Sequence, residues 1–162
     1  MLRRWFLAGA MAASACRVGA RSQDDLLVVT GPGGQRHRFT EDDLAGFDWH
    51  RIATHTVWTE GLRVFEGPLL RDVLAACVAD TAEIGQASLA MRALNDFRID
   101  MPARDAWEFD VILARTMDGA PMRVRDKGPL WVVYPRDDRR ELQTALYDER
   151  WIWQLCEIQI TA

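Results

Sequence analysis

The sequence has few of the residues that usually carry metal or redox chemistry, because its 162 residues include three cysteines and three histidines. It contains no Cys-x-x-Cys, His-Glu-x-x-His, Gly-x-Gly-x-x-Gly or Gly-x-Ser-x-Gly motif and no phosphate loop. His37, His50 and His55 also lack the spacing that presents two imidazoles to one metal ion. The sequence therefore offers no standard motif for a metal site, a nucleotide site or a serine nucleophile.

Lysine is almost absent, because Lys127 is the only one and the other nineteen of the twenty basic residues are arginines. With a formal net charge of −4, the chain lacks the positive surface with which proteins bind nucleic-acid phosphates. The one compact ammonium stands beside a Gly-Pro turn that opens an aromatic strand, in the segment Asp126–Pro135. This segment is the first candidate for a functional site.

Long apolar runs are missing beyond the N-terminus, so any membrane segment is expected there. Residues 1–20 have the charge-then-apolar order of an export signal, and Arg-Arg-x-Phe-Leu resembles a twin-arginine signal. Cleavage after Ala15 or Ala20 would release the protein, whereas a lipoprotein-like box would leave a lipid on Cys16. We expect a periplasmic protein without a membrane span once the signal is removed.

The remainder, residues 24–162, is predicted to form one α+β domain that is mixed and β-dominated. Apolar spacing predicts a helix at about 68–79 with Cys77 on its buried face, and Thr40 caps a second helix. Asp118-Gly119 is a strong hairpin signal. Cys77 and Cys156 are expected to be buried thiols, and a disulfide between them stays open. The remaining elements are strands at 26–30, 36–39, 52–59, 87–94, 109–117, 120–124, 130–134 and 155–161, and a short helix at 102–106.

Aromatic and polar residues cluster in four blocks, at 54–67, 94–102, 126–135 and 150–155. In this order the blocks resemble the molybdopterin-binding domain of the sulfite oxidase group, and the resemblance covers nearly all of residues 24–162. It implies the fold of that domain. The closer resemblance is to short exported bacterial members that lack the metal-ligand cysteine, including periplasmic pterin-binding regulatory proteins.

The chain departs from the enzymes of that group at three positions. Thr54 stands where the enzymes have the cysteine thiolate that binds molybdenum, and a threonine hydroxyl is too weakly acidic and too hard a donor to replace it. Lys127 stands where they tend to have histidine, and the segment at 150–155 replaces their phosphate contact. The resemblance thus implies a site that holds a reduced pterin ring as its ligand, without the molybdenum cofactor.

A pterin is a flat ring with polar edges, which suits aromatic faces and hydrogen-bonding groups. We expect no catalytic residue and no metal ligand. The candidate pterin-binding residues are Thr56, Trp58, Asn95, Asp96, Lys127, Trp131, Tyr134, Arg150 and Trp151.

Three functions remain open from the sequence. The first is a non-catalytic pterin-binding protein that signals to the periplasmic part of an inner-membrane sensor, such as an enzyme of cyclic-di-GMP turnover. The second is a molybdopterin-dependent oxidoreductase of the sulfite oxidase type with an atypical metal anchor. The third is a ligand-free scaffold for protein interaction, in which the tryptophans, Trp153 included, are core residues.

Overall fold

The computed structural model describes residues 24–161. The predicted export signal at 1–20, with Cys16, lies outside the described residues. Among the helices of the described part, none is long and apolar enough to cross a membrane.

The larger sheet has five strands in the order β2-β1-β11-β5-β6. In this sheet the first and last strands of the described chain, β1 and β11, are neighbours and pair in parallel. The other neighbouring strands are antiparallel. A register shift in β11 between Leu155 and Glu157 marks a bulge. The strands are β1 (Leu27–Thr30), β2 (Arg36–Phe39), β5 (Ser88–Ala93), β6 (Arg98–Pro102) and β11 (Leu155–Thr161).

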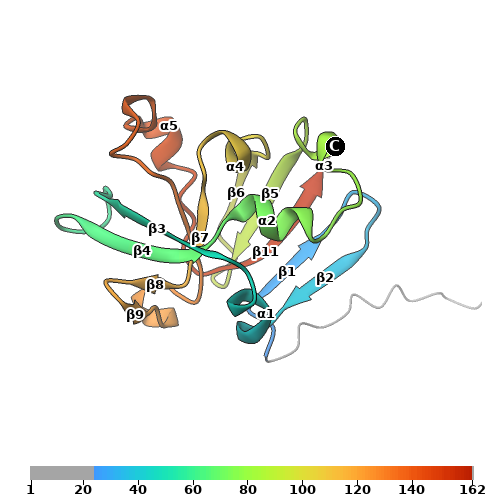
Figure 1. Ribbon diagram of the computed structural model, residues 1–162, viewed down its shortest axis with the longest axis horizontal. Coiled ribbons are helices and arrows are strands. Elements are labelled where there is room, and N and C mark those ends of the chain that lie inside the picture. Colours follow the sequence, from blue (N-terminus) through green and yellow to red (C-terminus); the bar gives the residue numbers. More distant parts are fainter. Residues whose placement is uncertain (1–23, 162) are drawn as a thin grey trace, which may run out of the picture.

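Two smaller sheets complete the β structure. The four-stranded sheet has the order β3-β4-β8-β9 and lies on the opposite side of the molecule from the five-stranded sheet, with β7 between them (Figure 1). Its strands are β3 (Trp49–Thr54), β4 (Arg63–Pro68), β8 (Thr116–Met117) and β9 (Ala120–Pro121). The two-stranded sheet pairs β7 (Ile112–Ala114) with β10 (Trp131–Val133).

The helices are short and connect the strands. Thr40 caps the first in a capping box, in which its hydroxyl accepts from the Asp43 N–H and the Asp43 carboxylate accepts from the Thr40 N–H. The α-helices are α1 (Glu41–Ala45), α2 (Leu70–Ala75), α3 (Thr81–Ile84), α4 (Asp105–Glu108) and α5 (Ala145–Asp148), and two 3₁₀ turns are η1 (Val124–Asp126) and η2 (Arg140–Leu142).

One hydrophobic core joins both larger sheets, the β7–β10 pair and most of the helices. It includes Leu27 of β1, Phe65 of β4, Leu74 of α2, Leu89 of β5 and Trp131 of β10, each of which is fully buried. A single continuous core means a single domain. The predicted mixed, β-dominated single domain is therefore confirmed.

Several elements differ from the sequence prediction. The strand predicted at 52–59 instead spans Trp49–Thr54, because the next N–H, that of His55, donates to the Asp137 carboxylate rather than to a strand. β4 and β6 were not predicted, and the helix predicted at 68–79 is shorter. The hairpin at Asp118-Gly119 is confirmed, with positive φ at both residues, and the buried Cys77 and Cys156 are not joined in a disulfide.

Candidate functional site

Four tryptophans from three segments of the chain meet in one group, which we call the tryptophan cluster: Trp58, Trp131, Trp151 and Trp153. The Trp58 ring centroid lies 6.3 Å from that of Trp131, 5.8 Å from Trp151 and 5.7 Å from Trp153. The rings of Trp58 and Trp153 meet edge to face, which is a favourable arrangement for aromatic pairs. Trp131 and Trp151 are buried, while Trp58 and Trp153 are half-buried and form the outer side of the cluster.

Strand pairing and a loop turn bring these rings together. Trp131 begins β10 and forms an antiparallel bridge with Trp153, and the Val132 N–H donates to the Ile152 carbonyl next to it. Trp58 lies in the loop at 55–62 that joins β3 to β4. Its N–H donates to the Thr56 hydroxyl, which lies 2.8 Å from the Thr59 hydroxyl. Local hydrogen bonds therefore fix the loop that carries the half-buried ring.

Lys127 reaches the cluster from a tight turn. Its backbone is in the left-handed region with φ 75°, and its carbonyl accepts from the Gln154 N–H. The following Gly128 has no room for a side chain, because a Cβ there would lie 2.0 Å from the Met122 carbonyl oxygen. The Lys127 side chain extends over Trp153, with its Nζ 4.1 Å from the ring centroid.

The Lys127 ammonium has no hydrogen-bond or ion-pair partner among residues 24–161. Its described contacts are with ring faces, that of Trp153 and, at 5.3 Å, that of Trp131. Burial lowers the pKa of Lys127, because the partly desolvated ammonium is less stable than one in water. A charge held in this way is available to an oxygen atom of a ligand.

Two further donors in the cluster lack partners. The indole Nε1–H groups of Trp131 and Trp151 are buried, and neither has a hydrogen-bond partner. A buried donor without an acceptor costs about 1 to 3 kcal/mol, so such groups are rare in folded proteins. Together with Lys127, they make the cluster rich in donors.

Thr54, the residue that the sequence resemblance matched to the metal-ligand cysteine, is fully buried at the end of β3. Its hydroxyl accepts from the Asp137 N–H at 3.1 Å and donates to the His55 carbonyl. The Asp137 carboxylate in turn binds the His55 imidazole, with Nδ1 and Oδ2 2.7 Å apart. The hydroxyl is therefore committed to the backbone, and its donor chemistry does not fit molybdenum.

A buried charged group lies behind the cluster. Tyr134 stacks on Trp151 and donates its hydroxyl to the Asp105 carboxylate at 2.8 Å. The same carboxylate oxygen lies 2.5 Å from the Arg150 guanidinium, which covers the ring of Tyr147. Burial, followed by the nearby Asp105 charge, raises the pKa of Tyr134 well above its ordinary value. Tyr134 and Arg150 are thus used in an internal network.

Asn95 and Asp96 lie in the exposed turn between β5 and β6. The Asn95 side chain accepts from the Phe97 N–H, and the Asp96 carboxylate pairs with Arg92 at 3.2 Å. Leu94 just before them donates its N–H to the Gln154 carbonyl, so the turn begins beside the residue that bonds Lys127. No described contact joins either side chain to the tryptophans.

The structure therefore brings together five of the nine candidates, Trp58, Trp131, Trp151, Tyr134 and Lys127, with Thr56 supporting the loop. Arg150 reaches the group through Asp105, and the turn at 95–96 stands apart. Sequence reasoning assigned Trp153 to the core, although Trp151-x-Trp153 next to a polar residue could have suggested a second aromatic face. The role of Asp105 carried no sequence signal, because its partners are 29 and 45 residues away.

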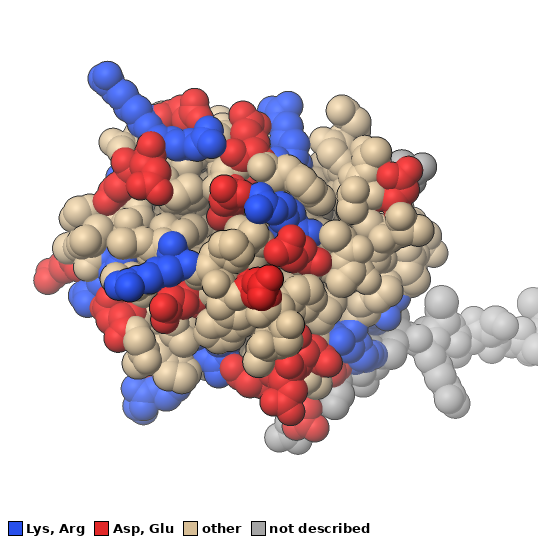
Figure 2. All heavy atoms as spheres, in the orientation of Figure 1, with Lys and Arg blue, Asp and Glu red and all other residues tan. Residues whose placement is uncertain are grey.

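The surface charges visible in Figure 2 are of both signs. On the face that Figure 2 shows, acidic and basic residues are interspersed with uncharged ones rather than gathered into one field. Among the described residues, no group of three or more His, Cys, Asp or Glu is placed to hold a metal ion. The described chemistry of the cluster is that of aromatic faces and hydrogen-bond donors, which suits binding of a flat molecule with acceptor atoms.

Comparison with known proteins supports the fold. No protein-family model matches the chain, and no curated protein matches its sequence. The structure is similar to that of the sulfane dehydrogenase SoxCD from Paracoccus pantotrophus, with a TM-score of 0.62 and 19% sequence identity. The match covers 89% of this chain and 40% of that chain, so the protein spans about two fifths of the length of its structural relative. At this identity the two share a fold, and no residue role follows.

Proposed function

We propose that this chain is an exported, non-catalytic pterin-binding protein built on a domain of the sulfite oxidase molybdopterin-binding type. The observation that carries the proposal is the contact between the single lysine and the tryptophan cluster, where an ammonium without an anionic partner lies over Trp153. In this proposal the half-buried rings of Trp58 and Trp153 form the walls of the site that holds the pterin, and Lys127 binds an oxygen of the ligand.

The hydrogen-bonding groups of a pterin match the donors of the cluster. One edge of the ring carries a carbonyl oxygen and ring nitrogens that accept, which suits the Lys127 ammonium. The other edge carries an amino group and a ring N–H that donate. Asp96, whose carboxylate is 80% exposed, is the acceptor that we propose for this edge, in exchange for its contact with Arg92.

The donor chemistry at Thr54 favours binding over molybdenum-dependent oxidation. The fold family suggests a molybdenum centre, but the residue at the ligand position is a hydroxyl that is buried and engaged by the Asp137 N–H. Molybdenum in such a site requires a soft, deprotonated ligand, and threonine supplies neither property. We therefore assign no step of a reaction to a metal cofactor.

A non-catalytic binding protein that signals must act on a partner protein. We propose that the pterin-loaded protein acts in the periplasm on the exposed part of an inner-membrane sensor, such as an enzyme of cyclic-di-GMP turnover. The export signal predicted at residues 1–20 and the resemblance to periplasmic pterin-binding proteins support this assignment. A ligand would act by its differential affinity for two states of the protein or of the complex.

The test is to purify the protein from its native host and to identify small molecules released on unfolding, by fluorescence and mass spectrometry. We expect a fluorescent pterin and no stoichiometric molybdenum in the same sample. Stoichiometric molybdenum with molybdopterin would support the oxidoreductase instead. A protein that is purified without a ligand, and whose melting temperature does not respond to added reduced pterins, would overturn the proposal. The ligand-free interaction scaffold would then be the remaining hypothesis.

A further inference from the structure

A series of aromatic rings in mutual contact runs from the outer side of the tryptophan cluster into the interior. The ring centroid of Trp58 lies 5.8 Å from that of Trp151. Trp151 in turn stacks on Tyr134, with 6.3 Å between the centroids and an interplanar angle of 26°. Trp58 is half-buried, whereas Trp151 and Tyr134 are buried. The series thus leads from a partly exposed ring to a buried phenol.

Each member of this series is a tryptophan or a tyrosine, the aromatic side chains that lose one electron most readily. Electron transfer between two rings slows steeply as their separation grows, so rings in contact exchange an electron far faster than distant ones. The chain has only two tyrosines, and the second, Tyr147, lies 6.0 Å from Tyr134. Among the ring contacts of residues 24–161, that of Trp151 alone joins the cluster to Tyr134. An electron lost from Trp58 is therefore replaced most directly through Trp151 and Tyr134.

The two buried members of the series differ in their proton acceptors. The Trp151 indole N–H has no hydrogen-bond partner within the described part of the chain, whereas the Tyr134 hydroxyl donates to the Asp105 carboxylate at 2.8 Å. One-electron oxidation turns either group into a much stronger acid, but only the phenol has a base in contact with it. Oxidised Tyr134 becomes a neutral radical by releasing its proton, while oxidised Trp151 keeps a positive charge in a buried place, which is costly. Tyr134 is therefore where the oxidising equivalent is most stable.

The surroundings of Tyr134 keep its proton in place before oxidation. Burial, followed by the nearby Asp105 charge, raises the pKa of Tyr134 well above its ordinary value. The Arg150 guanidinium forms an ion pair with the same Asp105 oxygen at 2.5 Å, so the buried carboxylate is held beside the phenol. The phenol and its base are thus arranged in advance, and the proton has a short way to move once the ring is oxidised.

We propose that Trp58, Trp151 and Tyr134 form a path along which the protein returns one electron to a one-electron oxidant of the aromatic-radical class at the outer side of the tryptophan cluster. The oxidant takes an electron from Trp58, Trp151 replaces that electron, and Tyr134 replaces the one lost by Trp151. Tyr134 loses one electron and its hydroxyl proton, which moves to the Asp105 carboxylate. The oxidant is reduced by one electron, and no bond between heavy atoms changes. The proposal does not depend on pterin binding, because any such oxidant beside Trp58 starts the transfer.

The test places an oxidant beside Trp58 in the full chain. A ruthenium polypyridine complex is attached through Val57→Cys, because Val57 is 56% exposed and precedes Trp58. The change Cys16→Ser leaves position 57 as the only accessible thiol, since Cys77 and Cys156 are buried. A light flash with an external quencher then produces ruthenium(III), and transient absorption follows the radicals.

In the parent protein that carries the complex, we expect a tryptophanyl signal that decays while a tyrosyl signal rises. The rise should be slower in D₂O, because the Tyr134 proton moves to Asp105 in the same step. The comparison of solvents uses one protein and so does not depend on how any variant folds. Absence of a tyrosyl signal, or an equal rate of its rise in both solvents, would overturn the proposal.

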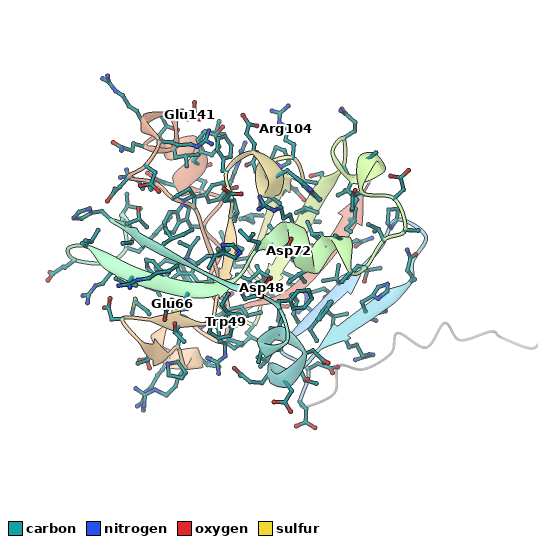
Figure 3. The ribbon with its side chains drawn as sticks, in the orientation of Figure 1. Asp48, Trp49, Glu66, Asp72, Arg104 and Glu141 are labelled. Carbon is teal, nitrogen blue, oxygen red and sulfur yellow. The ribbon has the colours of Figure 1, made fainter. Side chains whose placement is uncertain are left out.

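Variants of this labelled protein identify the path. Tyr134→Phe should abolish the tyrosyl signal, and Tyr147→Phe should retain it. Trp151→Phe keeps a ring in the stack but removes the oxidisable link, so the tryptophanyl signal should persist without a tyrosyl signal. Trp49→Phe is the control, because the Trp49 indole donates to the Leu44 carbonyl of α1, near which Figure 3 labels it, and has no described ring contact with the cluster.

The Trp49→Phe protein should reproduce the time course of the parent. Melting temperatures and near-ultraviolet circular dichroism show that each variant is folded before its radicals are compared. A tyrosyl signal that survives Tyr134→Phe, or that rises equally fast in Trp151→Phe, would show another path and overturn the proposal. Because no pterin is present in these experiments, their failure leaves the proposed binding function untouched.

Discussion

The Nζ of Lys127 lies 4.1 Å from the ring centroid of Trp153, and the Lys127 carbonyl accepts from the backbone N–H of Gln154, which follows Trp153. The turn at Lys127 and the aromatic strand end are thus held together by both backbone and side chain. Because the ammonium faces rings rather than a carboxylate, its charge is only partly compensated. This makes Lys127 sensitive to pH and to any ligand that brings an oxygen atom to it.

The first prediction concerns stability and pH. Burial lowers the pKa of Lys127 in the folded protein, so between that lowered value and the ordinary lysine pKa the unfolded chain binds more protons than the folded one. The free energy of unfolding therefore rises with pH in this window. At lower pH, where Lys127 is charged in both states, it no longer depends on the protonation of Lys127. We expect Lys127→Met to lack this rise when urea unfolding is measured across alkaline pH.

Arg125→Met is the matched control, because this nearby side chain is 71% exposed and loses a cation of the same sign. Its pH profile should follow that of the parent protein. If Lys127→Met and the parent protein give parallel profiles up to the ordinary lysine pKa, the environment described for the ammonium is wrong.

The second prediction concerns the aromatic face. Trp58→Ala removes a half-buried ring that contacts the other three tryptophans, and we expect it to weaken binding of a reduced pterin by about 1 to 3 kcal/mol. Isothermal titration calorimetry measures the affinity. Trp49→Ala is the control, since this tryptophan is 39% exposed and lies outside the cluster. Equal affinities of the two variants would remove Trp58 from the site.

Asp96→Ala tests the other edge of the proposed ring. We expect pterin binding to weaken by about 1 to 3 kcal/mol, because an amino group of the ligand would lose its charged acceptor. Asp100→Ala, in the exposed part of β6, removes the same charge nearby and should leave the affinity unchanged. An unchanged affinity in Asp96→Ala would restrict the site to Lys127 and the tryptophan cluster.

The fold could be predicted well where local signals were strong. Thr40 with Asp43 and the Asp118-Gly119 hairpin depend on residues close in sequence, and the structure confirms both. β4 was missed because Gly67 and Pro68 weaken its strand pattern, although Gly67 is needed where a Cβ would lie 2.0 Å from the Leu113 carbonyl oxygen. Such a close approach depends on tertiary packing, which the hydrophobic periodicity of the sequence does not indicate.

The sequence predicted which types of residue form the candidate site, but it predicted the roles of individual residues less well. The aromatic blocks at 54–67, 126–135 and 150–155 do meet in space. Tyr134 and Arg150 were predicted to bind the pterin, but a buried acid distant in sequence, Asp105, is already bonded to both side chains. The sequence shows that polar groups accompany the tryptophans, and only the packed structure shows which of them already have partners.

The third prediction concerns Thr54. Thr54→Ala removes the hydroxyl that accepts from the Asp137 N–H in a partly buried contact, and we expect a loss of about 1 kcal/mol in the free energy of unfolding. Thr54→Ser keeps the hydroxyl and should recover most of this stability. Denaturant unfolding of the three proteins provides the comparison. A serine variant as unstable as the alanine variant would assign the effect to the lost methyl group.

The fourth prediction concerns Cys77. Burial raises the pKa of its thiol to about 12, and the thiol donates to the Val73 carbonyl within α2. Because the thiolate is the reactive form, the folded protein should resist alkylation of Cys77 by iodoacetamide at neutral and mildly alkaline pH. Mass spectrometry after treatment with and without urea measures this difference. Rapid alkylation without urea would show that α2 opens readily.

The last prediction concerns the buried carboxylate of Asp105, which is 1% exposed and shares one oxygen between Arg150 and Tyr134. Arg150→Met removes the compensating charge, and we expect a loss of about 3 to 5 kcal/mol in the free energy of unfolding, because an unpaired buried anion is costly. The exposed pair of Arg139 and Glu141 provides the control, since Arg139→Met should cost less than about 1 kcal/mol. Adding Asp105→Asn to Arg150→Met should restore part of the stability, because it removes the stranded charge while keeping an acceptor for Tyr134. If the double variant is no more stable than Arg150→Met, lost packing of the arginine over Tyr147, rather than the buried charge, accounts for the effect.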